Sequence, residues 1–566
     1  MKKRYLCLTL LIPLLIISSC KQQTAETSSK QEEQEEEHFD RHVPTNLELG
    51  RDYSDLLNGD KWEYDDSFWY MNNLDKVPLP DPQVYAEEGT YYIVGTDDAS
   101  SCKLIVCYYT KDFIDYEKAT IYNPLNHSGC WEDRTNPTMY APEMYKVDSK
   151  YYLYYSAVEA STGKRRNSVV WADNPLGPYA PIVNDDVDGL HNALFAYDEQ
   201  YSVLDSTLFV DDNGDMYMYY SQYINNAQHI FGYKLISPYQ ADYSTRKMIV
   251  KPGAIDNESS EIILNWECYR TKSSQIAEGP FMLKSKGKYY MTYSVNGCWN
   301  KYYNVCYAVS DSPLGTFVKP YTEGQTWTNL LMGVPSTNDP ESVVYNQWTG
   351  FASGTGHHCF FKIGNQTMIG YHAHKNRNYN TDTSGYVARY FAMDPLYTLE
   401  DGTPFVNGPT WSPQPLPEVM TGYRNIAPEA SLKVENITNE KAINDQYIVD
   451  CYNLEQEEGK EVTLGQGYSF VKFKFDKKYS IKGISIYNSA NYENMIYDLN
   501  YISFSDGSAL GYSQFPSNCI NYDYEFVFPV SAFTFDFNED IETDSVIVSF
   551  NGDAGLRINE IQILAK

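Results

Sequence analysis

Residues 278–294 read EGPFMLKSKGKYYMTYS, and four other segments of the chain follow the same plan. Each segment begins with a short strand-like run, passes through a turn and ends in an aromatic-rich strand. The others are residues 81–96 (DPQVYAEEGTYYIVGT), 141–157 (APEMYKVDSKYYLYYSA), 205–221 (DSTLFVDDNGDMYMYYS) and 357–373 (HHCFFKIGNQTMIGYHA). Aromatic and β-branched residues around Gly or Asp turns are typical of hairpins. A hairpin that recurs about every 60–80 residues predicts an all-β fold, namely a five-bladed β-propeller whose blades are four-stranded sheets.

Equivalent positions of a radial repeat converge on the central axis. The residues that we align there are Asp81, Glu143, Asp205, Glu278 and His357. Acid–base hydrolysis needs one carboxylic acid to donate a proton and one carboxylate to activate water. Each Asp taken alone also suits a chain reversal, but Asp81, Asp205 and Glu278 at matching repeat positions favour catalysis.

Length and charge limit the classes of function. A chain of 566 residues exceeds one ordinary core, so two folded domains and a tail are expected. A net charge of −31 argues against nucleic acid and other polyanions as partners and favours a neutral substrate. Most of the 53 tyrosines are expected to pack between strands, and a few to contact sugar rings.

The N-terminus predicts export. Lys2, Lys3 and Arg4 precede an apolar run, and residues 1–20 end in Ser18-Ser19-Cys20, which resembles a bacterial lipobox. The resemblance implies a lipoprotein signal peptide and lipidation of Cys20. Residues 21–44 are acidic and polar and predict a disordered tether. We therefore expect a lipid-anchored protein of the bacterial cell envelope, at the outer membrane and surface-exposed.

The two folded domains are expected at residues 45–424, the propeller, and 425–566, a β-sandwich. A Pro-rich stretch at 404–417 separates them, and alternating runs such as 470–475 and 545–550 indicate half-buried strands. Residues 425–430 (NIAPEA) and 556–563 (LRINEIQI) resemble the discoidin family of sugar-binding sandwiches. Carbohydrate binding and a purely structural role are both open for this domain.

Five motifs in order resemble glycoside hydrolase family 43 over residues 70–415. They are Asp81-Pro82, Ala141-Pro142-Glu143, Asp205 with residues 208–214 (LFVDDNG), Glu278-Gly279-Pro280-Phe281 and Gly354-Thr355-Gly356-His357. The resemblance implies that Asp81 is the general base, Glu278 the general acid, and Asp205 the residue that orients the acid and raises its pKa. It also implies inversion of anomeric configuration, with acid and base roughly 6.5–9.5 Å apart.

Further roles follow from the same resemblance. Glu143, Trp131, Trp299 and Arg389 are expected to bind substrate, with the tryptophans as sugar platforms. His357 is expected to help hold one calcium ion at the propeller axis, partly through water, and no organic cofactor is expected. A structural Glu143, a buried hydrogen-bonded His357 and a surface ion pair at Arg389 are the competing interpretations.

The predicted function is removal of α-L-arabinofuranosyl or β-D-xylosyl residues from plant polysaccharide or its oligosaccharides. Galactan remains open as a substrate. Trp266-Glu267-Cys268 faintly resembles the acid motif of invertase-like propellers, which gives a second enzymatic hypothesis. A non-catalytic glycan-binding surface lipoprotein is the hypothesis from a different functional class.

Overall fold

A computed structural model describes most of the chain from Phe68 onward. The described residues are 68–72, 76–182, 194–195, 200–257, 264–268, 275–299, 302–333, 354–374, 388–410, 413–448, 460–489, 494–496, 499–511, 520–521, 526–527 and 532–566. The predicted signal peptide, the tether and Cys20 lie outside these ranges. Within the ranges, no helix combines the length and the apolar character needed to span a membrane.

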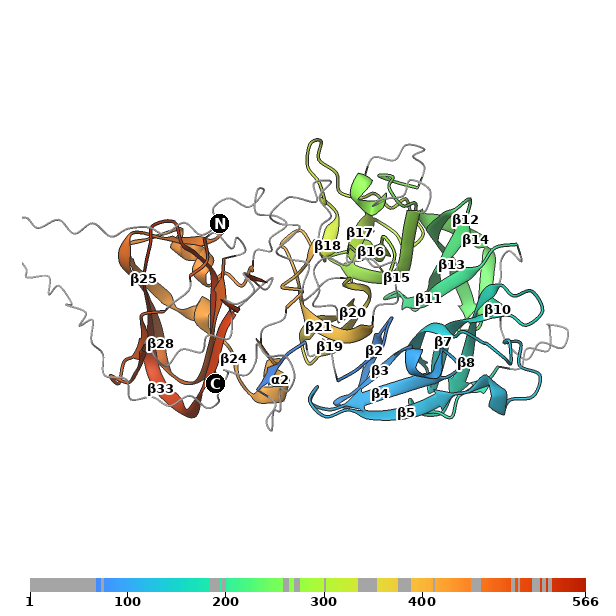
Figure 1. Cartoon of the computed structure of the whole chain (residues 1–566), viewed down its shortest axis with the longest axis horizontal. Coiled ribbons are helices and arrows are strands. Elements are labelled where there is room, and N and C mark those ends of the chain that lie inside the picture. The colour runs from blue at the N-terminus through green and yellow to red at the C-terminus, as the bar shows by residue number, and fades with distance from the viewer. Residues whose placement is uncertain are drawn as a thin grey trace, which may run out of the picture. The chain divides into compact units, whose positions relative to one another are not determined.

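Five groups of antiparallel strands follow one another along the first two thirds of the chain (Figure 1). The first contains β2 (Gln83–Glu87), β3 (Thr90–Thr96), β4 (Ile105–Thr110) and β5 (Glu117–Tyr122). The second contains β6 (Tyr140–Val147), β7 (Lys150–Val158), β8 (Arg165–Ala172), β9 (Ala180–Pro181) and β10 (Leu194–Phe195). The third contains β11 (Val203–Val210), β12 (Met216–Ile224), β13 (Ala227–Ser237) and β14 (Gln240–Val250). The fourth contains β15 (Gln275–Ser285), β16 (Lys288–Val295), β17 (Asn304–Ser310) and β18 (Leu330–Met332), and the fifth β19 (Gly356–Ile363), β20 (Gln366–His374), β21 (Arg389–Thr398) and β22 (Pro404–Val406). A short parallel pairing of β13 with β15 joins the third and fourth groups into one sheet.

The first strands of the five sheets form a closed ring. Contacts run from β2 to β6, β11, β15 and β19 in turn, and β19 returns to β2. Figure 1 shows β2 and β19 side by side, although most of the repeats lie between them in sequence. A ring of sheets that contact one another through their first strands is a β-propeller, here with five blades. The predicted fold is confirmed.

Backbone and side-chain bonds join the two ends of the propeller. β1 (Trp69–Tyr70) pairs with β23 (Gln414–Pro415). Asn72 Nδ2 donates to the Thr410 carbonyl at 3.0 Å. The buried Asp394 accepts a hydrogen bond from Tyr70 Oη at 3.4 Å, across the two ends, and another from Tyr371 Oη at 2.7 Å within the last blade. The ring is therefore held shut by contacts between segments more than 300 residues apart in sequence.

The C-terminal region forms a sandwich around two long strands, β28 (Gly467–Asn488) and β33 (Ala532–Gly552). Their pairing register shifts between Lys474 and Tyr479, so each strand contributes to two layers. The remaining strands are β24 (Arg424–Asn425), β25 (Ser431–Glu435), β26 (Ile437–Thr438), β27 (Val462–Leu464), β29 (Tyr501–Phe504), β30 (Ala509–Gly511) and β34 (Arg557–Ala565), with a separate pair, β31 (Ile520–Asn521) and β32 (Phe526–Val527).

Helices are few and short in the described residues. The one α-helix there is α2 (Glu418–Thr421). The 3₁₀ turns are η2 (Asp98–Ser100), η3 (Pro124–Asn126), η4 (Asn265–Cys268), η5 (Ala427–Glu429) and η6 (Glu440–Ile443).

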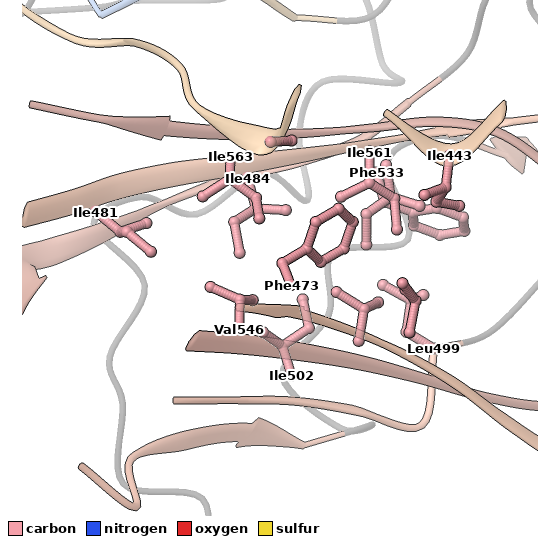
Figure 2. Close-up of a cluster of buried hydrophobic side chains, with 14 of the residues drawn as sticks. Ile443, Phe473, Ile481, Ile484, Leu499, Ile502, Phe533, Val546, Ile561 and Ile563 are labelled. Carbon is pink, nitrogen blue, oxygen red and sulfur yellow. The ribbon is translucent and has the colours of Figure 1, made fainter. Parts of the chain in front are cut away.

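The sandwich core lies between its two layers. Figure 2 shows Ile484 and Ile563 on one layer facing Val546 and Ile502 on the other, with Phe473 between them. All five side chains are buried. The alternation predicted for residues 470–475 is present, because Phe473 and Phe475 are buried and Lys474 is exposed.

Phe473→Ala tests this core. Removing a fully buried aromatic side chain should cost about 3–5 kcal/mol of unfolding free energy, because the cavity cannot close completely. Chemical denaturation followed by a sandwich-specific probe gives this value. Lys478→Ala, at an exposed position of β28, serves as the control and should change the unfolding free energy by about 0.5 kcal/mol or less. A loss of under about 1 kcal/mol for Phe473→Ala would contradict the assigned core.

Candidate active site

One pocket of about 580 Å³ gathers most of the predicted site residues. Asp81, Asp205, Glu278, His357, Arg389 and Trp299 line it. They come from four of the five blades and from the loop after β16. The remaining lining residues are Asp98, Ser101, Cys102, Thr138, Tyr140, Arg165, Leu204, Tyr223, Gln228 and Cys298.

In every blade, one residue at the start of the first strand has the left-handed backbone conformation. Asp81, Asp205 and His357 have φ values of 54°, 56° and 47°, and the corresponding residues of the second and fourth blades are Ala141 (43°) and Gly279 (53°). Non-glycine residues seldom adopt this conformation, and surrounding contacts must maintain it. The pairing register shifts beside it in blades two to five, as in a β-bulge. Bulges of this kind redirect side chains next to active sites.

Hydrogen bonds between neighbouring blades hold these residues in place. Four of their N–H groups bond to a second-strand side chain of the preceding blade: Ala141 to Thr96 Oγ1 (3.0 Å), Asp205 to Ser156 Oγ (3.0 Å), His357 to Ser294 Oγ (2.7 Å) and Asp81 to His372 Nδ1 (3.1 Å). At the fifth junction the Gly279 N–H donates to Asp205 Oδ2 (3.2 Å), which also accepts from Ser221 Oγ (2.9 Å). We call this set the axial ring.

Asp81 is surrounded by groups that favour its ionised form. Arg389 Nη1 lies 2.9 Å from Asp81 Oδ1, Thr96 Oγ1 donates to Oδ2 at 2.6 Å, and His357 Nδ1 lies 3.3 Å from Oδ1. Burial acts to raise the pKa of Asp81, but the charges of Arg389 and His357 and the hydrogen bonds outweigh it and lower the pKa. Asp81 is therefore a carboxylate at neutral pH, as a general base must be.

Glu278 has the opposite character. Burial, and then the charges of Asp205 and Asp81, raise the pKa of Glu278 to about 8. Burial also raises the pKa of Asp205, while the charge of His357 opposes that rise. Glu278 is therefore mainly protonated at neutral pH and can donate a proton. The predicted effect of Asp205 on Glu278 agrees with these charges, although burial raises the pKa of Glu278 more than the charge of Asp205 does.

The expected place of Glu143 was wrong. Glu143 is buried and does not line the pocket. Ala141, two residues earlier, has the left-handed backbone that Asp81 and Asp205 have in their blades, so the repeat was aligned two residues too late. Glu143 accepts a hydrogen bond from Tyr145, whose hydroxyl lies 2.9 Å from Thr207 Oγ1. This environment fits a structural role for Glu143.

The two predicted tryptophan platforms differ in position. Trp299 lines the pocket and is 52% exposed, as a sugar platform requires. Trp131 is 3% exposed and packs in a hydrophobic cluster with Tyr122 and Tyr155, so it is a core residue and cannot contact substrate. Its prediction was wrong because an aromatic residue before a strand suits packing as well as sugar binding.

His357 does not form a calcium cage with its neighbours. No group of three or more His, Cys, Asp or Glu side chains suited to a metal ion occurs among the described residues. Calcium prefers six to eight oxygen ligands, whereas His357 presents Nδ1 to the Asp81 carboxylate. The described residues therefore offer no cluster of protein ligands for calcium, and a calcium ion held by His357 partly through water stays a prediction.

Tyr140, Arg165 and Tyr223 line the pocket and were not predicted. Tyr140 directly precedes Ala141, and Tyr223 lies two residues beyond Ser221, so extending the repeat alignment at both ends would have found them. Glu267, the acid of the invertase-like hypothesis, lies elsewhere. It forms a buried ion pair with Lys319 and accepts from Tyr293 Oη at 2.7 Å.

Comparison with known proteins gives one family. Residues 70–404 match the model described as glycosyl hydrolases family 43. A β-D-galactofuranosidase of Aspergillus niger is 25% identical over 57% of this chain and 80% of its own length. An extracellular endo-α-(1→5)-L-arabinanase of Bacillus subtilis is 25% identical over 26% of this chain and 34% of its own length. The crystal structure of a thermostable family-43 glycoside hydrolase is 25% identical and covers 62% of this chain and 99% of its own, with a TM-score of 0.48.

The raised pKa of Glu278 predicts a pH-dependent stability. Because the folded-state pKa is about 8 and the ordinary value 4.5, its contribution is fully present below pH 4.5 and lost as the pH rises towards 8. Glu278→Gln stays neutral, so its melting temperature should rise relative to wild type between pH 5 and about pH 8 and should level off above that pH. The corresponding difference in unfolding free energy should change by up to ~1.4 kcal/mol per pH unit.

Thermal melts of both proteins across this range measure the difference. Glu88→Gln, at an exposed position, is the matched control and should give a constant offset. A constant offset for Glu278→Gln as well would show that Glu278 titrates alike in the folded and unfolded states.

Proposed function

The chain belongs to glycosyl hydrolase family 43, and on that basis we propose that it is an inverting glycosidase acting on plant polysaccharides or their oligosaccharides. The sugar residues that it is proposed to release are α-L-arabinofuranosyl or β-D-xylosyl groups. The observation that carries the proposal is the opposite protonation of two carboxyl groups in one pocket. Asp81 has a lowered pKa, whereas that of Glu278 is raised to about 8.

These two groups supply the two proton transfers of single-step hydrolysis. Glu278 donates its proton to the glycosidic oxygen as the bond from that oxygen to the anomeric carbon breaks. Asp81 accepts a proton from a water molecule whose oxygen forms the new bond to the anomeric carbon from the opposite face. Asp205, whose charge raises the pKa of Glu278, is a positioning residue. The product has inverted configuration.

The sugar is proposed from the named relatives. One is an endo-α-(1→5)-L-arabinanase, and another, 28% identical over 30% of this chain, is a β-xylosidase of Xylanibacter ruminicola. The match to a β-D-galactofuranosidase supports a galactose-containing substrate as the second candidate.

An invertase-like glycosidase and a non-catalytic glycan-binding protein receive less support. An invertase-like acid at Glu267 is inconsistent with its position, since Lys319 neutralises it away from the pocket. A purely glycan-binding protein would not need the opposed pKa shifts of Asp81 and Glu278.

Location and the second domain are further parts of the proposal. The lipobox-like Ser18-Ser19-Cys20 supports a lipid anchor at Cys20 and an outer-membrane, surface-exposed site. An extracellular relative agrees with export. The sandwich of residues 425–566 is proposed to bind carbohydrate, on the resemblance of its end motifs to discoidin domains.

Three variants test the mechanism. Glu278→Gln should lose several orders of magnitude in rate on oligosaccharides, which have poor leaving groups, and less on aryl glycosides, which need less protonation. Asp81→Asn should damage both substrate types, because water activation is needed in each case. Chromogenic arabinofuranosides, xylosides and galactosides give the rates, and proton NMR of the first product gives the stereochemistry. Unchanged rates in both variants, or a product of retained configuration, would overturn the mechanism.

Asp205→Asn, the third variant, tests the charge that acts on Glu278. Activity requires protonated Glu278 and falls as the pH rises through its pKa, about 8 in the wild type. Removing the charge of Asp205 lowers that pKa, so the basic limb of the kcat/KM profile should move to lower pH. A basic limb that stays in place would assign the raised pKa to burial alone.

The anchor is tested by mass spectrometry of the mature protein from a bacterial host. An N-terminal Cys20 carrying acyl chains is the expected result. Cys20→Ser is the control and should release the protein from the membrane fraction. Unmodified protein with Cys20 retained inside the chain would indicate simple secretion.

A further inference from the structure

Two adjacent arginines at the start of β8 have opposite surroundings. Arg166 is buried, and its Nε lies 3.2 Å from Glu159 Oε2 while its Nη1 donates to the Tyr201 carbonyl at 2.7 Å. Arg165 points to the other face of the strand, since successive strand residues alternate. That face belongs to the pocket, which Arg165 lines.

Arg165 has no carboxylate partner among the residues that the structure describes. No acidic oxygen there lies within 4.0 Å of its guanidinium, and its buried Nε has no hydrogen-bond acceptor. Its side chain instead contacts the ring of Tyr140, whose centroid lies 5.1 Å from Arg165 Cζ. Arg389, which also lines the pocket, forms an ion pair with Asp81. Arg165 is thus a cation held against an aromatic ring at the edge of the candidate active site, and no carboxylate of the described residues compensates its charge.

The position of Arg165 relates it to the reacting groups. Asn167, two residues along the same face of β8, accepts from Ser156 Oγ at 2.9 Å, and Ser156 holds the Asp205 N–H. Tyr223 also lines the pocket: burial raises its pKa to about 12, with the charge of Glu278 adding to the rise and that of Arg165 opposing it. Arg165 therefore lies in the same pocket as Asp205 and Glu278.

We propose that Arg165, on its Tyr140 platform, binds a carboxylate of the substrate, so that the enzyme prefers a glycan with a uronic acid residue next to the cleaved bond. The inference rests on the proposed glycosidase function and adds a substrate class to it. A planar guanidinium matches a carboxylate in two parallel N–H···O bonds, which a neutral hydroxyl cannot reproduce. An aromatic face beneath the guanidinium fixes its plane without removing its charge.

The acidic surface is compatible with one bound carboxylate. A net charge of −31 acts at long range and is screened over about 10 Å at 0.1 M salt. The contact with Arg165 is short and partly buried, so it is screened much less. The expected ligand is therefore a mainly neutral glycan with an isolated carboxylate, and extended polyuronates are disfavoured.

Binding is measured first, in the Glu278→Gln background, where hydrolysis is blocked. The calorimetric probes are D-glucuronate and D-galacturonate, with D-glucose and D-galactose as their neutral counterparts, and xylotriose carrying one glucuronic acid with its carboxyl-reduced form. At least one acidic probe should bind roughly 10- to 100-fold more tightly than its neutral counterpart. Adding Arg165→Gln should bring the ratio of acidic to neutral binding to about one. Arg165→Lys keeps the positive charge but cannot form two parallel N–H···O bonds, so it should restore part of the ratio.

Arg134→Gln is the matched control, because it removes the same charge from an exposed position outside the pocket. It should leave the acidic-to-neutral ratio as it was. Equal binding of every acidic and neutral pair, or a ratio that survives Arg165→Gln, would overturn the inference.

Hydrolysis separates this inference from the proposed function. With wild-type enzyme, the ratio of kcat/KM between the acidic and the carboxyl-reduced oligosaccharide should fall roughly 10-fold or more in Arg165→Gln. Binding that discriminates acids without any hydrolysis would support Arg165 and refute the glycosidase. Hydrolysis of neutral glycosides with no acidic preference would support the glycosidase and refute the carboxylate site.

Discussion

The axial ring of hydrogen bonds is the constraint on which the site depends. Each blade begins with a residue of left-handed backbone, and in the four blades where this residue is not glycine the conformation is unfavourable and persists only where its surroundings fix it. Those surroundings are second-strand side chains of the preceding blade, such as Ser156 for Asp205 and His372 for Asp81. No single blade can therefore present its catalytic residue in the active geometry. The closed ring of blades is what turns five similar hairpins into one site.

Because the ring also sets burial, it sets the acidity of the carboxyl groups. Asp81 and Glu278 are both buried, and burial alone would raise the pKa of each. The difference comes from their neighbours: Asp81 has Arg389 and the Thr96 hydroxyl, whereas Glu278 has Asp205. Two residues of similar chemistry thus take opposite roles through their partners, and the charged partners, Arg389 for Asp81 and Asp205 for Glu278, come from other blades.

Much of the fold and the core of the site could be predicted from the sequence. The repeats specify hairpins, and equivalent positions of a propeller meet, so Asp81, Asp205 and Glu278 could be placed in one pocket. Glu143 could not be placed correctly, because a bulge sets the inner position at Ala141 and a bulge has no clear sequence signature. Trp131 was misassigned because burial depends on tertiary packing. Arg165 was missed because its contribution comes from a third strand, where the repeat pattern carries no information.

The order of the chain has a consequence for biosynthesis. Asp81 belongs to the first blade, and its ion-pair partner Arg389 follows 308 residues later, on the last blade. His372, which holds the Asp81 N–H, also belongs to that blade. During synthesis the surroundings of Asp81 therefore remain incomplete until the fifth blade emerges and closes against the first. A partly made or prematurely terminated chain carries every early motif and still has no working site, so hydrolytic activity marks the completed propeller.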